Sequence, residues 1–265
     1  MAGLTFKTQL PNLLLRNFCR ALPAPNATLS TEEQFAVMSR RLVLDFNTTV
    51  LGGTERRQAE RNQMTQVAKH MRICLGIKEG FESAVTVAAS EPILTEAAAT
   101  IVQHIQTFRS CQALRNILQW PGMSKGDRGE LIVCNITIDT LDSLMFKYRQ
   151  LQSLIVSATS YFEALFGSNC YNETIRNSFP STLAHEDHNK TFAETFKDAR
   201  LYITHFIKVH DYVSAEFLQK CIVRGVAIVC ADNQCGADMV LPVVYKDSEL
   251  KIQNITCILK RSKND

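Results

Sequence analysis

The sequence predicts a mixed α/β (α+β) protein, with a helix-rich region first, a small β-hairpin within it, and a mixed sheet in the last third. Three observations support this fold class. Apolar residues recur at helical spacing in several segments before residue 167. Apolar and polar residues alternate over 201–209, which is the period of a strand. The run 226–231 is continuously apolar, which is typical of a strand covered on both faces.

The boundaries of the expected elements follow from caps and breakers. Ser30 and Glu33 form a capping-box pattern at the start of a helix. Pro92 suits the first turn of another, and Gly225 ends a helix that Ser214 begins. The expected helices are 8–20, a segment from 30, 55–70, 90–106, 112–120, 127–150, 153–166 and 214–224, and the expected strands are 71–77, 83–89, 201–209, 226–231, 237–245 and 250–263.

The composition is that of an ordinary globular protein: 46% of the 265 residues are hydrophobic and 21% are charged, with a net charge of +3. This charge permits contact with nucleic acid without requiring it. The nine cysteines are odd in number, most of them lie in apolar runs, and there is no CxxC pair, which indicates a reducing compartment. We therefore expect a soluble intracellular protein, cytoplasmic or nuclear, with no membrane span. A mitochondrial presequence in the first thirty residues is disfavoured against an ordinary first helix.

Several site classes find little support in the sequence. Neither GxxxxGK[ST] nor GxGxxG occurs, so no nucleotide motif is present. His185 and His188 lack the HExxH spacing of a zinc site, and a solvated loop is the favoured interpretation. His205 falls on the apolar face of its expected strand, where we expect a hydrogen-bonded core histidine. Arg128 and Glu130 stand at a well-formed helix start, which is a structural role. The alternative is that Arg128 or Glu130 lines a site, with Arg128 as the candidate for substrate binding.

The C-terminal strands carry the residues that point to chemistry. Asp238 stands near the start of one expected strand, and Arg261 and Lys263 near the end of the next. Side chains two apart share a face of a strand. Metal-dependent phosphodiester cleavage uses acids on two such strands to hold Mg²⁺, with a lysine that assists attack by water. Asp238 and Lys263 are therefore the catalytic candidates, and Arg261 is a candidate for phosphate contact. Glu216, on the preceding helix, is a weak metal-ligand candidate beside Asp238, although its spacing to Lys220 also suits a surface pair.

On the stretches 230–238 and 258–265, this region resembles the core of the PD-(D/E)xK, restriction-endonuclease-like superfamily. The chain is also similar to a family of mushroom-forming fungi whose members resemble the Crinkler-type NTPase–nuclease proteins. That likeness runs through the stretches 41–47, 70–75, 80–83, 125–130 and 205–211. It implies a nuclease-derived sheet and Mg²⁺ as the metal if the site is active. The NTPase-like region of longer relatives has no match in this sequence.

Two departures from that pattern change the expected function. The family's third strand ends in Gln-Val-Lys, whereas this chain has Arg261-Ser262-Lys263, with a guanidinium at the metal-ligand position. Its repulsion of a dication at about 4 Å costs several kcal/mol in a partly buried site. The chain also stops soon after the motif, which predicts a truncated sheet with an exposed edge or face.

We therefore expect a helix-rich region over 1–166, a loop or linker over 167–191, and an incomplete nuclease-like core over 192–265. The leading hypothesis is a degenerate nuclease-like protein of mobile-element or effector-like origin, without efficient cleavage and without a required cofactor. The alternatives are a non-catalytic module that binds a protein partner and an active Mg²⁺-dependent nuclease. A nucleic-acid partner is the weaker expectation.

Overall fold

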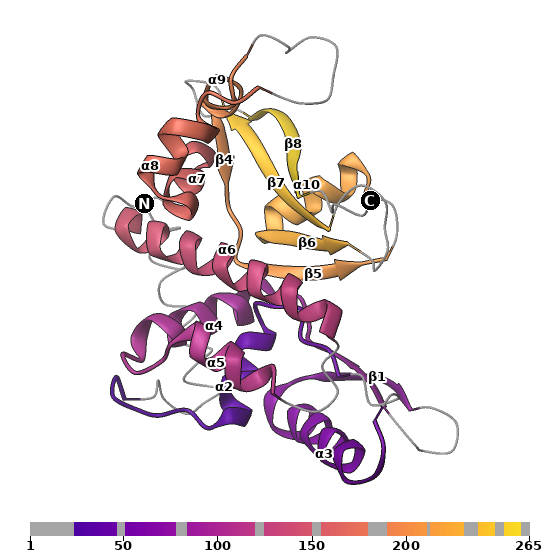
Figure 1. The fold of residues 1–265 in the computed structure, drawn as a ribbon. Coiled ribbons are helices and arrows are strands. Elements are labelled where there is room, and N and C mark those ends of the chain that lie inside the picture. The colour runs from indigo at the N-terminus through magenta and orange to yellow at the C-terminus, as the bar shows by residue number, and fades with distance from the viewer. Residues whose placement is uncertain are drawn as a thin grey trace, which may run out of the picture. The chain divides into compact units, whose positions relative to one another are not determined.

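The computed structural model describes residues 24–46, 51–77, 84–119, 125–149, 155–179, 190–210, 213–230, 238–246 and 252–260. The chain divides into two compact units. Unit 1 comprises 1–135 and 204–207, and unit 2 comprises 136–203 and 208–265. The fold class is confirmed: helices dominate the N-terminal part, an antiparallel hairpin interrupts them, and a mixed sheet forms the C-terminal part (Figure 1).

Unit 1 is built on helices α2 (Thr31–Ser39), α3 (Gly53–His70), α4 (Pro92–His104) and α5 (Ser110–Ile117). Helix α2 packs against the other three, and Phe35 and Ile117 are fully buried in this core. The predicted capping box is confirmed, because Ser30 Oγ accepts from Glu33 N–H while Glu33 Oε2 accepts from Ser30 N–H. The predicted start of α4 is also confirmed, with a proline in the first turn.

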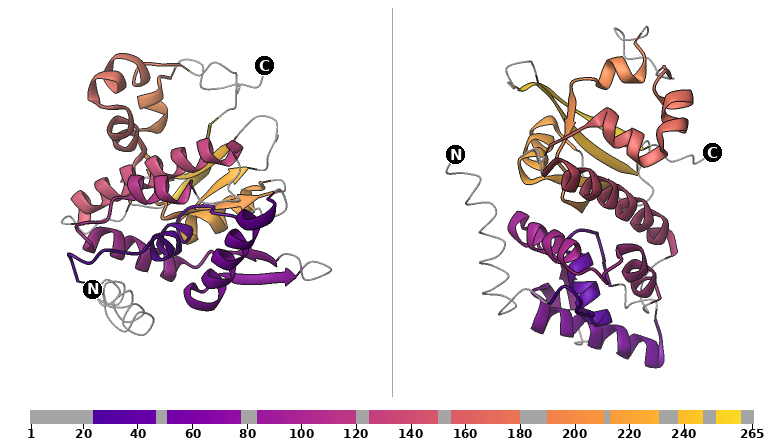
Figure 2. Two further views of the ribbon diagram at one scale, coloured as in Figure 1. Left: turned by 60° about the horizontal axis from the view of Figure 1, so that its bottom comes forward. Right: turned by 90° about the vertical axis from the view of Figure 1, so that its left-hand side faces the viewer.

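The predicted hairpin is formed by β1 (Ile73–Ile77) and β2 (Ala84–Val87), which pair antiparallel with a bulge in β1 between Cys74 and Gly76. It follows α3 through Met71, the one non-glycine among the described residues with a positive φ, at 56°. After this left-handed residue, Arg72 N–H donates back to Gln66 C=O, which satisfies a carbonyl near the end of the helix. All five residues of β1 are exposed. The left view of Figure 2 shows β1 extending away from the helices of unit 1.

Unit 2 contains most of a six-stranded sheet. Its strands are β3 (Val156–Ser157), β4 (Ala199–Leu201), β5 (His205–Val209), β6 (Val226–Cys230), β7 (Met239–Lys246) and β8 (Ile252–Lys260). The order is β3-β4-β7-β6-β5, and β8 pairs with β7. Along β7, the end near Met239 pairs with β6 and the end near Tyr245 pairs with β4, whereas β8 pairs along nearly the whole strand. Since β6 and β4 take successive stretches of β7, they lie on the edge opposite β8.

Helix α10 (Ala215–Arg224) connects β5 to β6 and packs against β6, β7 and β8. Figure 1 shows β5 and β6 running in the same direction, whereas the pairs formed by β7 are antiparallel. The predicted cap is present, because Ser214 Oγ accepts from Phe217 N–H, and Gly225 ends the helix at φ 67°. Every residue of β6 is buried, as its continuous apolar run predicted.

Helices α6 (Lys125–Arg149), α7 (Ala158–Phe166), α8 (Ser168–Cys170) and α9 (Phe192–Phe196) and the π-helix η2 (Tyr171–Ile175) complete the described elements. Helix α7 packs on β3 and β4. The expected helix 8–20 lies outside the described residues.

Three expected elements need correction. The single strand expected over 201–209 is two strands, because β4 ends at Leu201 and β5 begins at His205. The expected helix 153–166 begins only at Ala158, because Val156 and Ser157 pair with β4 and Ser157 then caps the helix. The stretch 167–191 is not irregular throughout, since 168–175 are helical. The predicted domain boundaries remain predictions, and the division into compact units falls at 135/136.

Candidate functional site

Asp238 lies directly before β7, at the point where β6 ends beside it. Its backbone C=O accepts a hydrogen bond of 2.9 Å from Cys230 N–H, which joins the end of β6 to the start of β7. The residue is half-buried. The sheet therefore fixes the backbone that carries this carboxylate, as a catalytic or metal-binding group requires.

The pairing of β7 with β8 ends at the same point. Met239, the residue after Asp238, pairs with Lys260, the last residue of β8. Arg261 and Lys263, predicted to contact phosphate and to assist cleavage, come next in the chain and lie outside the described residues. The structure thus brings Asp238 next to the strand end that leads into the predicted motif.

Glu216 belongs to the first turn of α10 and forms a surface ion pair. Its Oε1 lies 2.7 Å from Lys220 Nζ, and its side chain is 75% exposed. The hydrogen bond from Lys220 and the positive charge of that residue lower the pKa of Glu216. The spacing of four residues had suggested this pair, and it directs Glu216 toward a neighbour on its own helix. Its role as a metal ligand remains a prediction.

A magnesium ion would require several oxygen ligands around Asp238. Within the described part of the chain, no group of three or more His, Cys, Asp or Glu side chains could hold a metal ion. Mg²⁺ binding at Asp238 remains a prediction.

Arg128 lies in the first turn of α6 and is half-buried. Its Nε is buried and has no hydrogen-bond partner among the described residues. The helix begins at Lys125, two residues before the expected start at 127. The prediction that this stretch begins a helix is confirmed. A substrate-binding role for Arg128 remains a prediction. His185 and His188 lie outside the described residues.

His205 is almost fully buried, with 1% of its surface exposed, and both ring nitrogens have hydroxyl neighbours. Nε2 lies 2.8 Å from Ser90 Oγ, and Nδ1 lies 3.1 Å from Thr204 Oγ1. The expectation of a hydrogen-bonded core histidine is confirmed. No local pattern predicted that Ser90 contacts His205, because the two residues lie 115 positions apart. Because the imidazole has hydroxyls at these positions and is buried, the arrangement is that of a satisfied core group.

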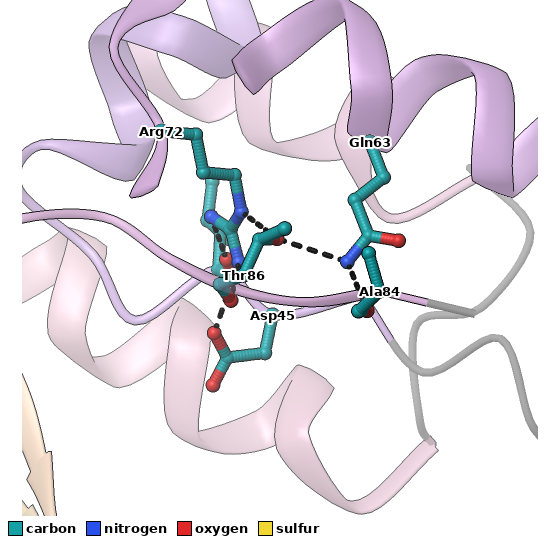
Figure 3. A network of polar contacts seen from close by, with 6 residues as sticks. Asp45, Gln63, Arg72, Ala84 and Thr86 are labelled. Atoms are coloured by element: carbon teal, nitrogen blue, oxygen red, sulfur yellow. Dashed lines mark hydrogen bonds and ion pairs between the residues drawn. The ribbon is translucent and has the colours of Figure 1, made fainter. Parts of the chain in front are cut away.

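A buried polar network in unit 1 surrounds Arg72 (Figure 3). Its guanidinium donates to Thr86 Oγ1 at 2.6 Å, to Leu44 C=O at 2.9 Å and to Thr86 C=O at 2.9 Å. A fourth bond, of 3.2 Å, reaches Asp45 Oδ1. Gln63 Nε2 donates to Thr86 Oγ1 as well, at 2.9 Å. One buried side chain thus joins the end of α3, the strand β2 and the segment 44–45.

Electrostatics around Arg72 favour a structural role. Its side chain is 1% exposed, whereas that of Asp45 is 58% exposed. Burial lowers the pKa of Arg72, and the charge of Asp45 partly offsets this. Arg40, also buried, donates from Nη2 to His70 C=O at the end of α3, where a cation complements the helix dipole. Its Nη1 is buried without a hydrogen-bond partner among the described residues. Both arginines hold backbone carbonyls in place.

The fold and these sites define a mixed α/β protein with a helical unit, an antiparallel β6-β7-β8 core and an aspartate, Asp238, directly before β7. The chain belongs to the family described as Domain of unknown function (DUF8736), whose model matches residues 48–264 and so covers parts of both units. No curated protein and no solved structure matches the chain. Among the described residues, no helix is long and apolar enough to cross a membrane.

Proposed function

We propose that the C-terminal sheet derives from a metal-dependent nuclease and no longer cleaves phosphodiester bonds efficiently. The observation that carries this proposal is the register of β7 with β8, in which the last pair, Met239 and Lys260, directly adjoins Asp238. Arg261 follows Lys260 in the sequence, and we propose that it is the residue opposite Asp238. Lys263 then shares the face of Arg261, because strand side chains alternate.

Whether the side chain opposite Asp238 is negative or positive decides whether a divalent metal ion can bind there. A guanidinium about 4 Å from a dication is repelled by about 8 kcal/mol at an effective dielectric constant of about 20. A metal site with a dissociation constant near 1 mM supplies only about 4 kcal/mol. The repulsion therefore exceeds what a weak magnesium site provides, and Asp238 would pair with Arg261 instead. Arg261 would then be more suited to a phosphate than to a metal.

The test is nicking of supercoiled plasmid with Mg²⁺ or Mn²⁺, together with Mn²⁺ binding measured by calorimetry. We expect neither activity nor tight binding in the wild type. Arg261→Glu, which supplies a second carboxylate, should gain Mn²⁺ binding, and adding Asp238→Ala should abolish it. Metal-dependent nicking by the wild type that disappears in Asp238→Ala would show an active nuclease. Failure of Arg261→Glu to bind Mn²⁺ would remove the argument for a nuclease-derived site.

A specific observation favours the second candidate, a module that binds a protein partner. The hairpin exposes four large aliphatic side chains: Ile73 at 45%, Leu75 at 63%, Ile77 at 60% and Val85 at 45%. Single exposed aliphatic residues are ordinary, whereas several on one exposed hairpin often mark an interaction surface. The strand that carries three of them has no charged residue within 73–77.

This candidate is tested with Leu75→Lys, which places a charge in the middle of the group. The matched control is Val223→Lys on α10, where the valine is 83% exposed. A partner isolated from native extract should be retained by the control and lost with Leu75→Lys. Equal retention by both variants would exclude the hairpin as the binding surface.

A further inference from the structure

Unit 1 contains a half-open cavity of about 110 Å³ at the start of α5. Its floor is apolar and buried, formed by Ile105, Phe108 and Ala113. Its rim is polar, with Thr28, Thr107 and Gln112. An apolar floor beneath a few polar groups is the usual arrangement of a small-ligand site.

Hydrogen bonds hold the walls of this cavity in place. Gln106 N–H donates to Pro25 C=O at 2.8 Å, and Thr107 Oγ1 donates to Ala27 C=O at 2.7 Å. On the other wall, Gln34 Nε2 donates to Leu29 C=O at 2.9 Å. The segment before α2 is thus fastened to the α4–α5 connection. The cavity is formed before any ligand arrives, so binding needs little reordering.

The cavity has one charged residue in its lining, the exposed Arg109. Its Nη1 donates to Gln106 C=O at 3.2 Å and to Phe108 C=O at 3.4 Å, which fixes the guanidinium beside the opening. Among the described residues, no carboxylate forms an ion pair with it, and no acid lines the cavity. An anionic group at the rim would therefore meet a single positive charge.

We propose that this cavity binds a short branched-chain carboxylate, with the branched tail on Ile105 and Phe108 and the carboxylate at Arg109. The volume of the cavity limits the size of the apolar tail. An apolar protein cavity of about 150 Å³ holds benzene, so a cavity of about 110 Å³ suits a smaller, four-carbon branched group. The positive charge of Arg109 favours an anionic head group, and its guanidinium fork complements a carboxylate. The inference is independent of the nuclease proposal, because it concerns only unit 1.

The test uses isovalerate, whose tail is an isobutyl group, as the probe in ligand-observed and protein-observed NMR titrations at constant ionic strength. Isovaleramide lacks the charge, and acetate lacks the branched tail. We expect saturable binding of isovalerate, and binding of each of the other two weaker by about threefold or more. Arg109→Gln should weaken isovalerate to the level of isovaleramide. Arg115→Gln, an exposed arginine on α5 that does not line the cavity, should leave binding unchanged.

A filled cavity provides a second check. Ala113→Leu adds three carbons at the floor and should abolish binding of isovalerate, with folding verified by circular dichroism. If that variant does not fold, the comparison of Arg109→Gln with Arg115→Gln still tests whether isovalerate binds at this cavity. The proposal is overturned if isovalerate does not saturate, if the amide binds equally well, or if Arg109→Gln binds isovalerate as the wild type does.

Discussion

Replacing Arg72 by methionine should destabilise unit 1 strongly. The substitution keeps an unbranched chain of similar length but removes four hydrogen bonds, three of which go to Leu44 C=O, Thr86 C=O and Thr86 Oγ1. A buried acceptor left without a donor costs about 1–3 kcal/mol. Loss of the guanidinium also removes its desolvation cost, which offsets part of this sum. We therefore expect a loss of about 3–5 kcal/mol, the range found when buried polar networks are broken.

The measurement is urea unfolding followed by far-UV circular dichroism, with the free energy taken from the transition of unit 1. The matched control is Arg57→Met, an exposed arginine on α3, which should change the free energy of unfolding by less than about 0.5 kcal/mol. Arg72→Lys keeps the charge but loses the fork that reaches several carbonyls, and should fall between the two. A loss below about 1 kcal/mol for Arg72→Met would refute the structural role of the network.

Three further predictions concern single positions. Met71→Gly should raise the free energy of unfolding by about 1 kcal/mol, because it relieves the left-handed conformation at φ 56°; a lower unfolding midpoint in urea would contradict this. Burial lowers the pKa of His70 more than the charges of Glu33 and Glu32 raise it, so below about pH 6.5 the unfolded chain takes up a proton that the folded chain does not. Stability should therefore fall as pH drops from about 7 to about 5, with a smaller slope in His70→Gln, and identical slopes would show that His70 does not contribute. A thiol reagent should modify the exposed cysteines quickly and the buried ones only on unfolding, with mass spectrometry assigning the sites; among the cysteines whose burial the structure describes, Cys74, Cys111 and Cys170 are exposed, and Cys134, Cys221 and Cys230 are buried.

Local signals predicted the elements that depend on neighbouring residues. The capping box of Ser30, the proline at the start of α4 and the glycine that ends α10 act within a few positions, so they are visible in the sequence. The buried strand β6 was visible because both its faces are apolar. The position of Asp238 near the start of a strand was also predicted, because the residues that follow it form a mostly apolar run.

The break at 202–204 had no local signal. Its alternating pattern is that of one strand, but Arg41, 163 positions from Thr204, donates from Nε to Thr204 C=O at 3.2 Å. Arg41 C=O accepts from Phe206 N–H at 2.9 Å. These contacts occupy backbone groups near the break that a continuous strand would offer to a sheet neighbour. The pairing of Val156 with Leu201 likewise changed an expected helix start into a strand.

The sequence by itself determined the fold class, most of the helices and the succession of the C-terminal strands along the chain, because caps, breakers and periodicity act over a few residues. Only the tertiary structure decided which distant groups meet: Ser90 with His205, Arg72 with Thr86 and Leu44, and Arg109 with the cavity floor. Such contacts depend on how the chain returns on itself to satisfy buried polar groups, and a local pattern contains no information about that path.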